Sequence, residues 1–403
     1  MPWKNETRVA QRSQLVHAML RKEGSIAEVC RRYGVSRPTA YKYLRRFRAE
    51  GRKGLVDRKR GPSTEGKRAR KWSARLLRQR ARHPTWGGRK LLWKLRQLYP
   101  RQRPPSERTL DRWLSKKALA RRRTHKRHAQ WVKGTWTMSG RPNDVWTVDF
   151  KGWFRTKRGQ RIEPLTVRDL HSRYLFAVEP VSGTGVVPVR RVFQRLFARY
   201  GLPRAIRSDR GAPFCGSGPL GLTQLSLWWH RLGILVEFVN RRERRNNNAH
   251  EQMHRVLQAE VASVPQRTMR AQVRALRKWQ VGYNQSRPHE ALGLNTPASR
   301  YRRSQRSLHK LRWPRYPQSW LVRTVRAAGD IHINYRTYGV GRAFQRLPVG
   351  LKPLGDGKYK VFFERLPIGE IDLGTDRSMQ RLRSKSRKGR GPSPLPNPPH
   401  PAG

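Results

Sequence analysis

Apolar residues at helical spacing open the chain and predict three short helices. The first carries one apolar stripe, the second is expected over residues 26–32, and the third follows Ser36, a favoured N-cap residue. The stripe of the first helix consists of Val9, Leu15, Ala18 and Met19. Gly34 separates the second helix from the third, so this order predicts a helix-turn-helix.

The expected third helix has an apolar face and a basic face. Tyr41, Leu44 and Phe47 form the apolar face, and Pro38 suits the first helical turn. The basic face consists of Arg37, Lys42, Arg45 and Arg46. A one-sided basic helix suits the major groove of DNA, whereas a helical hairpin with a merely structural role does not need one.

A basic arm and a second helical module follow. Arg58, Lys59 and Arg60 lie between glycines and a proline, which suits either an extended arm along a DNA groove or a flexible linker. Residues 1–62 are therefore expected to form a DNA-binding domain with this arm, and residues 63–120 a second helix-turn-helix-like domain. Its three-helix unit is expected to begin at His83. The apolar and capping residues of its helices are Leu91, Leu92, Leu95, Ser106, Leu110, Trp113 and Leu114.

From Asn143 the pattern changes from helices to short strands. Three antiparallel strands are expected, followed by a helix that ends at Gly201, a buried strand, a helix, a strand and a final helix from Asn248. The expected strands are residues 145–150, 164–169, 174–179, 205–208 and 234–239, and the middle helices cover 189–200 and 222–232. This order predicts an α/β domain over residues 143–300, after a basic linker over residues 121–142.

The C-terminal part has the alternation of a small all-β domain. Short apolar runs and glycine turns predict a small β-barrel over residues 320–374, after a linker over 301–319. This barrel either contacts DNA or neighbouring subunits, or only stabilises the chain. Residues 375–403 are first basic and then proline-rich, which is typical of a disordered tail.

Charge narrows the class of partner. Lysine and arginine number 91 against 25 acidic residues, so the formal net charge is +66. Such a charge needs a polyanion, and nucleic acid is the expected one, although a ribosomal or chromatin-like protein has similar charge. The apolar runs are too short for a membrane span and the start is polar, so we expect a soluble, cytoplasmic, nucleoid-associated protein without a membrane partner. Only Cys30 and Cys215 occur, so carboxylates or histidines must hold any metal.

Three carboxylates occupy informative positions in the expected α/β domain. Asp149 lies inside the first strand, Asp209 directly follows the fourth, and Glu251 lies on the first turns of the last helix. If the first and fourth strands are neighbours, the three acids converge. Oxygen ligands of this kind suit two Mg²⁺ or Mn²⁺ ions, which promote in-line displacement at a phosphodiester. Taken singly, the same acids also fit a satisfied core aspartate, a turn cap and a helix N-terminal acid.

Several runs of the sequence resemble insertion-sequence transposases with a retroviral-integrase-like catalytic core. The resemblance extends from Met1 to about Leu373. The runs that carry it are 143–152 (NDVWTVDFKG), 165–169 (LTVRD), 201–209 (GLPRAIRSD), 248–251 (NAHE) and 283–292 (YNQSRPHEAL). It implies an RNase-H-like fold, the catalytic acids Asp149, Asp209 and Glu251 of an Asp-Asp-Glu polynucleotidyl transferase, and cleavage and joining of mobile-element ends.

The resemblance also implies double-stranded DNA as partner, both element ends and target, and a homo-oligomer that holds two ends together. Two segments depart from the family pattern. Arg210 stands where the family usually has asparagine, and residues 241–245 (RRERR) replace a proline- and glutamine-containing stretch. Two alternatives therefore stay open. One is a catalytically inactive copy that acts as a sequence-specific DNA-binding protein, and the other is a metal-dependent nuclease without strand transfer.

Overall fold

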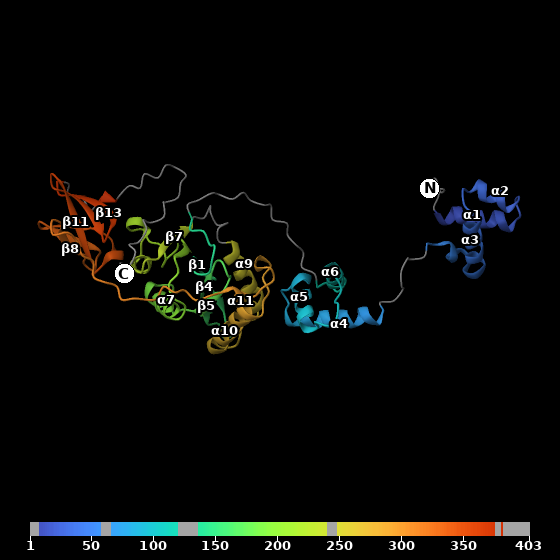
Figure 1. Ribbon diagram of the computed structural model, residues 1–403, viewed down its shortest axis with the longest axis horizontal. Coiled ribbons are helices and arrows are strands. Elements are labelled where there is room, and N and C mark those ends of the chain that lie inside the picture. The colour runs from blue at the N-terminus through green and yellow to red at the C-terminus, as the bar shows by residue number, and fades with distance from the viewer. Residues whose placement is uncertain (1–7, 58–65, 120–135, 240–247, 375–379, 382–403) are drawn as a thin grey trace. The chain divides into compact units, whose positions relative to one another are not determined.

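The computed structural model describes residues 8–57, 66–119, 136–239, 248–374 and 380–381. The chain divides into two compact units, residues 1–74 and 75–403 (Figure 1). Much of the predicted basic arm, of the linker over residues 121–142 and of the tail over residues 375–403 lies outside the described residues. Among the helices that the structure describes, none has the length and apolar content that a membrane span requires.

The first unit contains the predicted helix-turn-helix. Its helices are α1 (Arg8–Leu20), α2 (Ile26–Arg32) and α3 (Arg37–Glu50), followed by the 3-10 turn η1 (Gly51–Leu55). The Ser25 hydroxyl accepts from the Glu28 N–H and the Glu28 carboxylate accepts from the Ser25 N–H, which starts α2 with a capping box. The small core of this unit includes Leu15, Val16, Val29, Ala40, Leu44 and Leu55.

One residue of the predicted apolar face is misplaced. Tyr41 is 52% exposed, whereas Ala40, Tyr43 and Leu44 are buried. The inward stripe of α3 therefore runs through residues 40, 43, 44 and 47, and Tyr41 lies on the outward face with the basic residues. The outward face thus offers an aromatic ring beside its cations.

Three helices form the second helical module. They are α4 (Lys67–Arg82), α5 (Gly88–Leu98) and α6 (Glu107–Lys116). The module does not begin at His83 as predicted, because α4 precedes that residue. Basic residues surround the buried Trp72 and Leu76 of α4, which dilutes its apolar stripe. Ser106 caps α6 as expected, since its hydroxyl accepts from the Thr109 N–H.

A mixed five-stranded sheet forms the centre of the second unit. Its order is β5-β4-β1-β6-β7, with β1 antiparallel to β4 and parallel to β6. The strands are β1 (Val145–Phe150), β4 (Pro164–Asp169), β5 (Leu175–Pro180), β6 (Ala205–Asp209) and β7 (Leu235–Val239). A short hairpin of β2 (Phe154–Arg155) and β3 (Arg161–Ile162) joins β1 to β4. The predicted strand order is confirmed, and the hairpin is an addition.

Helices cover both faces of this sheet. Trp146, Val148 and Val167 belong to the core cluster shared with α7 (Val186–Tyr200) and α8 (Gln224–Arg231). The alternate residues of the same strands include Asp149 and Thr166 and face the other way. That face is covered by α9 (Asn248–Leu257), the π-helical turn η4 (Gln258–Ala262) and α10 (Met269–Gln285). The predicted catalytic face of the sheet is therefore the one under α9.

The C-terminal segment forms open sheets, and the predicted small β-barrel is not confirmed. The larger sheet has the order β14-β13-β12-β11-β8, and β9 and β10 pair separately. The strands are β8 (Leu321–Thr324), β9 (Asp330–Ile333), β10 (Arg336–Gly339), β11 (Pro348–Gly355), β12 (Lys358–Phe363), β13 (Leu366–Asp372) and β14 (Gln380–Arg381). A barrel requires its two edge strands to pair, and β8 and β14 are not paired in the described residues. An ion pair of 3.0 Å between Arg231 and Glu364 ties the larger sheet to α8.

Candidate active site

Two neighbouring parallel strands carry Asp149 and Asp209. β1 pairs with β6 up to Thr147 opposite Arg207. Each aspartate follows two residues later, so the two lie at the same level of adjacent strands. The Gly211 N–H donates to the Asp209 carboxylate at 3.1 Å, which fixes this carboxylate in the turn after β6.

Electrostatic coupling links these aspartates with Glu251 on α9. Burial raises the pKa of Asp149 to about 7, and the negative charges of Asp209 and Glu251 add to the effect. The Asp149 side chain is 25% exposed, whereas Asp209 and Glu251 are exposed residues. The charges of Asp209 and Glu251 thus both act on Asp149, which is the most enclosed of the three predicted acids.

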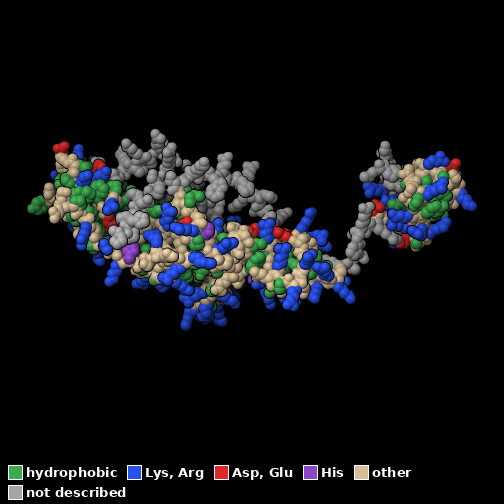
Figure 2. All heavy atoms as spheres, in the orientation of Figure 1, with side chains coloured by type: hydrophobic (Ala, Val, Ile, Leu, Met, Phe, Trp, Pro, Cys, Tyr) green, Lys and Arg blue, Asp and Glu red, His purple; other side chains and the backbone are tan. Residues whose placement is uncertain are grey.

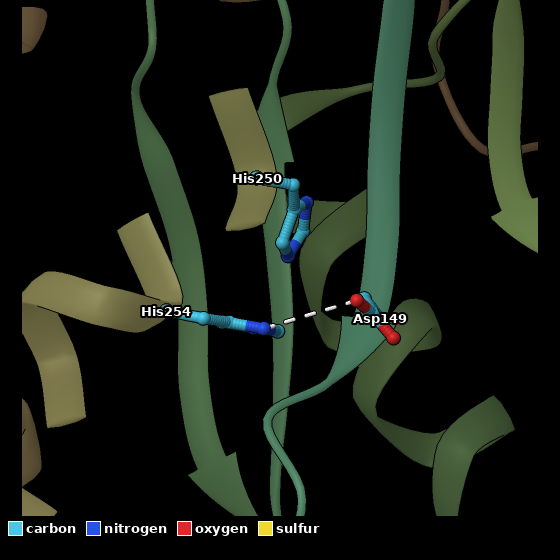
Figure 3. Close-up of side chains that lie close together, drawn as sticks. All are labelled: Asp149, His250 and His254. Carbon is cyan, nitrogen blue, oxygen red and sulfur yellow. Dashed lines mark ion pairs between the residues drawn. The ribbon is translucent and has the colours of Figure 1, made fainter. Parts of the chain in front are cut away.

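Two histidines of α9 complete the surroundings of Asp149. Figure 3 shows His250 and His254 projecting from α9 towards Asp149, and one ligand atom from each of the three lies within 4.8 Å of the others. The Thr166 hydroxyl joins them, because it lies 2.7 Å from His250 Nε2 and 2.8 Å from His254 Nε2. The same hydroxyl donates to the Asp149 carbonyl at 2.8 Å. Four side chains from two strands and one helix therefore form one polar cluster.

The hydrogen bonds of Thr166 determine the tautomer of His254. The Thr166 hydroxyl has one proton and donates it to the Asp149 carbonyl. Towards His254 it is therefore the acceptor, and the Nε2–H of His254 is the donor. Burial lowers the pKa of His254 to about 3, and the nearby charges of Lys151 and Arg168 lower it further. His254 is therefore neutral near pH 7, and its Nδ1 carries a lone pair.

That lone pair faces a carboxylate oxygen. His254 Nδ1 lies 3.8 Å from Asp149 Oδ2, the contact drawn as a dashed line in Figure 3. Because the imidazole is neutral, this contact is not an ion pair. It brings two hydrogen-bond acceptors together, which is favourable only when a proton or a cation is shared between them. The donor set, which combines carboxylate oxygens with an imidazole nitrogen, fits a divalent metal ion.

His250 has a supporting position in the cluster. It is buried, its Nδ1 lies 2.8 Å from the Thr147 hydroxyl, and its Nε2 is used by Thr166. Burial lowers its pKa well below the usual range, so it is neutral as well. With both ring nitrogens hydrogen-bonded, His250 holds α9 against the sheet at the level of Glu251.

Sequence reasoning did not assign a role to either histidine. His250 and His254 are four residues apart and therefore share one helix face, which is the spacing of paired histidine ligands on helices. That spacing was the available signal. Two histidines on a helix also occur without any ligand role, so the register against Asp149 was needed to give the pattern meaning.

A buried ion pair offsets the charge of Arg207, one of the buried arginines of the central sheet. Arg207 Nε lies 2.8 Å from the Glu237 carboxylate, and their side chains are 6% and 2% exposed. Glu237 also accepts from the Thr137 N–H at 2.8 Å. Arg207 pairs with Thr147 in the sheet, so its charge would otherwise act on the acids two residues further along. The ion pair with Glu237 offsets that charge.

The structure describes only one of the two departures from the family pattern. Arg210 is exposed and forms no ion pair with Asp209 among the described residues. It therefore does not occupy the Asp209 carboxylate. Residues 241–245 lie outside the described residues.

The predicted DNA-binding residues of α3 are mostly accessible. Arg37, Lys42 and Arg45 are exposed, and Arg46 is half-buried. Lys42 lies over the Tyr43 ring at 5.6 Å from its centroid. Arg58, Lys59 and Arg60 lie outside the described residues. Lys and Arg side chains are spread widely over the faces of both units that Figure 2 shows, with few acidic ones among them.

Comparison with protein families supports this organisation. A helix-turn-helix domain matches residues 11–63, and integrase core domains match residues 139–243 and 232–297. The C-terminal domain of the IS481 family of transposases matches residues 321–379. The core matches include Asp149, Asp209 and Glu251. They confirm the predicted resemblance to insertion-sequence transposases with an integrase core.

Curated relatives are insertion-element proteins. An uncharacterised 31.7 kDa protein of insertion element IS407 from Burkholderia multivorans is 27% identical over 182 residues, which are 45% of this chain and 63% of that protein. An uncharacterised 39.2 kDa protein of insertion element IS476 from Xanthomonas euvesicatoria is 28% identical over 161 residues, 40% of this chain and 44% of that one. The chain thus spans less than two thirds of the length of either relative.

Solved structures with a distant likeness are retroviral integrases. The catalytic core domain of HTLV-2 integrase with magnesium has a TM-score of 0.31 at 14% identity, and covers 40% of this chain and 99% of that one. A simian T-cell lymphotropic virus intasome, in complex with a PP2A regulatory subunit, has a TM-score of 0.36 at 12% identity over 72% and 96% of the two chains. Likeness at this level is too weak to place any residue or ligand of this chain.

Proposed function

We propose that the chain is a transposase that cleaves phosphodiesters at mobile-element ends and joins the resulting 3′-hydroxyls to target DNA. The carrying observation is the coupling of Asp149, Asp209 and Glu251 at one end of a sheet inside an integrase core. Burial first, and then the charges of Asp209 and Glu251, raise the pKa of Asp149, and bound cations would offset this repulsion.

Asp149, Asp209 and Glu251 would hold two Mg²⁺ or Mn²⁺ ions, and His254 would add a nitrogen ligand next to Asp149. When bound, such ions lower the pKa of an attacking hydroxyl and offset charge on the leaving oxygen. The chain's own residues have a separate task. Thr166 and His250 hold α9 in register with β1, so Glu251 keeps its place relative to the two aspartates.

The remaining domains would supply DNA recognition and assembly. We assign residues 1–62 to binding of element ends through the α3 residues Arg37, Lys42, Arg45 and Arg46 and through the arm residues Arg58, Lys59 and Arg60. The other proposed domains are 63–120 as a second DNA-binding module, 121–142 as a linker, 143–300 as the catalytic core, 301–319 as a linker, 320–374 as a C-terminal domain and 375–403 as a tail. Because two ends must be joined in one reaction, a homo-oligomer on DNA follows.

The test is a strand-transfer assay with the full chain on duplexes that carry the flanking element ends, with Mg²⁺ or with EDTA. We expect joined products from the native chain with Mg²⁺ and none from Asp209→Asn. Asp356→Asn is a matched control, because Asp356 is exposed in a C-terminal turn at a φ of 49°, where asparagine is well tolerated. The control should retain the joined products.

Two other outcomes assign the alternatives. Cleaved but never joined DNA would identify a metal-dependent nuclease. A folded native chain that binds the ends and yields no product would favour an inactive copy that acts as a sequence-specific DNA-binding protein.

A further inference from the structure

A polar cavity lies on the same face of the sheet as the acids. It has a volume of about 490 Å³ and is lined by residues of β4, α5, α9 and the segment after α10. On α9, His250 and His254 face Asp149, whereas Arg255 and its neighbours line this cavity. One helix thus borders both the candidate active site and the cavity.

The lining is strongly cationic. The charged residues that line the cavity are Lys90, Arg168, Arg173, Arg255, Arg287 and Glu290. Five of these six carry positive charge. The single carboxylate, Glu290, is shared with Arg89 outside the cavity at 3.5 Å. The lining therefore has a large surplus of positive charge in a partly enclosed space.

Part of this charge is balanced within the protein and part is not. Arg287 pairs with Glu260 at 3.0 Å and donates to the Thr85 hydroxyl at 3.2 Å, so it has a structural role. Lys90 and Arg173 form no ion pair within the described ranges. Both are half-buried, where an unbalanced cation is costly.

The pKa values reflect the same imbalance. Burial lowers the pKa of Lys90 to about 8, and the positive charge of Arg287 adds to the effect. Burial likewise lowers the pKa of Arg173 and that of Arg168, the latter to about 10. An anion in the cavity would offset the positive charges of Lys90 and Arg173.

A neutral hydrogen-bonding group completes the lining. His289 Nε2 is buried and has no hydrogen-bond partner among the described residues. Burial lowers the pKa of His289 to about 2, and Lys90 and Arg287 lower it further, so the ring is neutral and can donate from one nitrogen. Cations together with a neutral N–H donor are the partners that phosphate oxygens prefer.

We propose that this cavity receives backbone phosphates of the DNA on which the candidate active site acts, an assignment that rests on the proposed function. Two features favour DNA over a small anion. Lys90 belongs to α5 of the second helical module, so the cavity joins that module to the core. Arg255 lines the cavity and is an exposed residue, so the positive charge reaches the protein surface, where a continuous strand of phosphates can approach.

The test measures binding of plain duplex DNA by the full chain in EDTA, which separates it from catalysis. The pocket variant is Lys90→Gln with Arg173→Gln, and Arg255→Gln is a milder second variant on the exposed rim. The control is Arg191→Gln, because Arg191 is exposed on α7, which covers the opposite face of the sheet. Thermal unfolding verifies that each variant is folded.

We expect the pocket variant to reduce the slope of log binding constant against log salt by about 2, which corresponds to two lost phosphate contacts. Random ethylation of the duplex phosphates should weaken binding by the native chain and by Arg191→Gln more than it weakens binding by the pocket variant. Arg255→Gln should reduce the slope by about 1.

An unchanged slope and ethylation effect in the folded pocket variant and in Arg255→Gln would overturn the assignment. An equal reduction of the salt slope in Arg191→Gln would overturn it too, because it would show that any exposed positive charge has the same effect. A second measurement is the rate at which an acylating reagent modifies Lys90. If inorganic phosphate or an acidic peptide slows this modification and duplex DNA does not, the assignment is also overturned. Failure of strand transfer alone would leave these binding results intact, so the two proposals fail separately.

Discussion

Replacing Asp149 by asparagine should stabilise the metal-free protein while it removes the proposed activity. Asp149 is enclosed beside Asp209 and Glu251, and its carboxylate oxygen faces the lone pair of His254. An asparagine carries no charge, and its amide can donate to His254 Nδ1. The substitution therefore removes one repulsion and adds one hydrogen bond.

The magnitude follows from the raised pKa. The ordinary value is 3.8 and the folded value is about 7. At about 1.4 kcal/mol for each tenfold change in acidity, the ionised carboxylate costs about 4 kcal/mol. Since the side chain is 25% exposed, solvent screening reduces this cost, and we expect about 2 to 4 kcal/mol.

The direction of the pKa shift of Asp149 determines how the stability difference depends on pH. The folded chain binds this proton more tightly than the unfolded chain does, so the cost of Asp149 grows as pH rises from about 4 to about 7 and is constant above that range. Asp149→Asn should therefore match the native chain near pH 4 and be more stable at pH 8. The core transition should then lie roughly 5 to 10 °C higher in the variant.

Differential scanning calorimetry in EDTA at pH 4, 6 and 8 measures this difference, with Asp356→Asn as the control that should shift little. Addition of Mg²⁺ at pH 8 should stabilise the native chain more than Asp149→Asn and so reduce the gap. A variant that is no more stable than the native chain at pH 8, or a gap that does not depend on pH, would refute the reasoning.

Three further substitutions test other parts of the account. Glu237→Gln leaves the buried Arg207 without its partner, so urea unfolding should show a loss of about 3 to 5 kcal/mol, and adding Arg207→Met should restore most of it. Arg45→Ala should weaken binding to element ends in a gel-shift titration and change stability by less than about 0.5 kcal/mol, because Arg45 is exposed on α3; unchanged affinity would argue against α3 as the recognition helix. His254→Gln should abolish the nitrogen hyperfine coupling of bound Mn²⁺ in pulsed electron paramagnetic resonance, a coupling that an oxygen-only site would lack already in the native chain.

The sheet and its acids were accessible to sequence reasoning because their signals are local. β-branched and aromatic residues mark β1 and β4, and glycine ends α7 at Gly201. Asp149 inside an apolar strand is conspicuous, since burial of a lone carboxylate is costly. The parallel pairing of β1 with β6 then brings Asp209 beside it.

Other features depend on long-range contacts that no local pattern contains. The helix α4 escaped prediction because basic residues dilute its apolar stripe around Trp72. The open C-terminal sheets could not be distinguished from a barrel, since both have alternating strands and only the pairing of β8 and β14 differs. The cationic cavity joins residues as distant in sequence as Lys90 and Arg287, which only the tertiary fold brings together.

The most direct test of the central claim is the joining of labelled element ends to a target plasmid by Glu251→Gln. Glu251 is the acid that the helix α9, and no strand, brings to the site. The matched control is Glu370→Gln, an exposed glutamate on β13. With DNA affinity equal to that of the native chain, Glu251→Gln should yield no joined product while Glu370→Gln yields the native amount. Joined product from Glu251→Gln at the native rate would contradict a three-carboxylate active site.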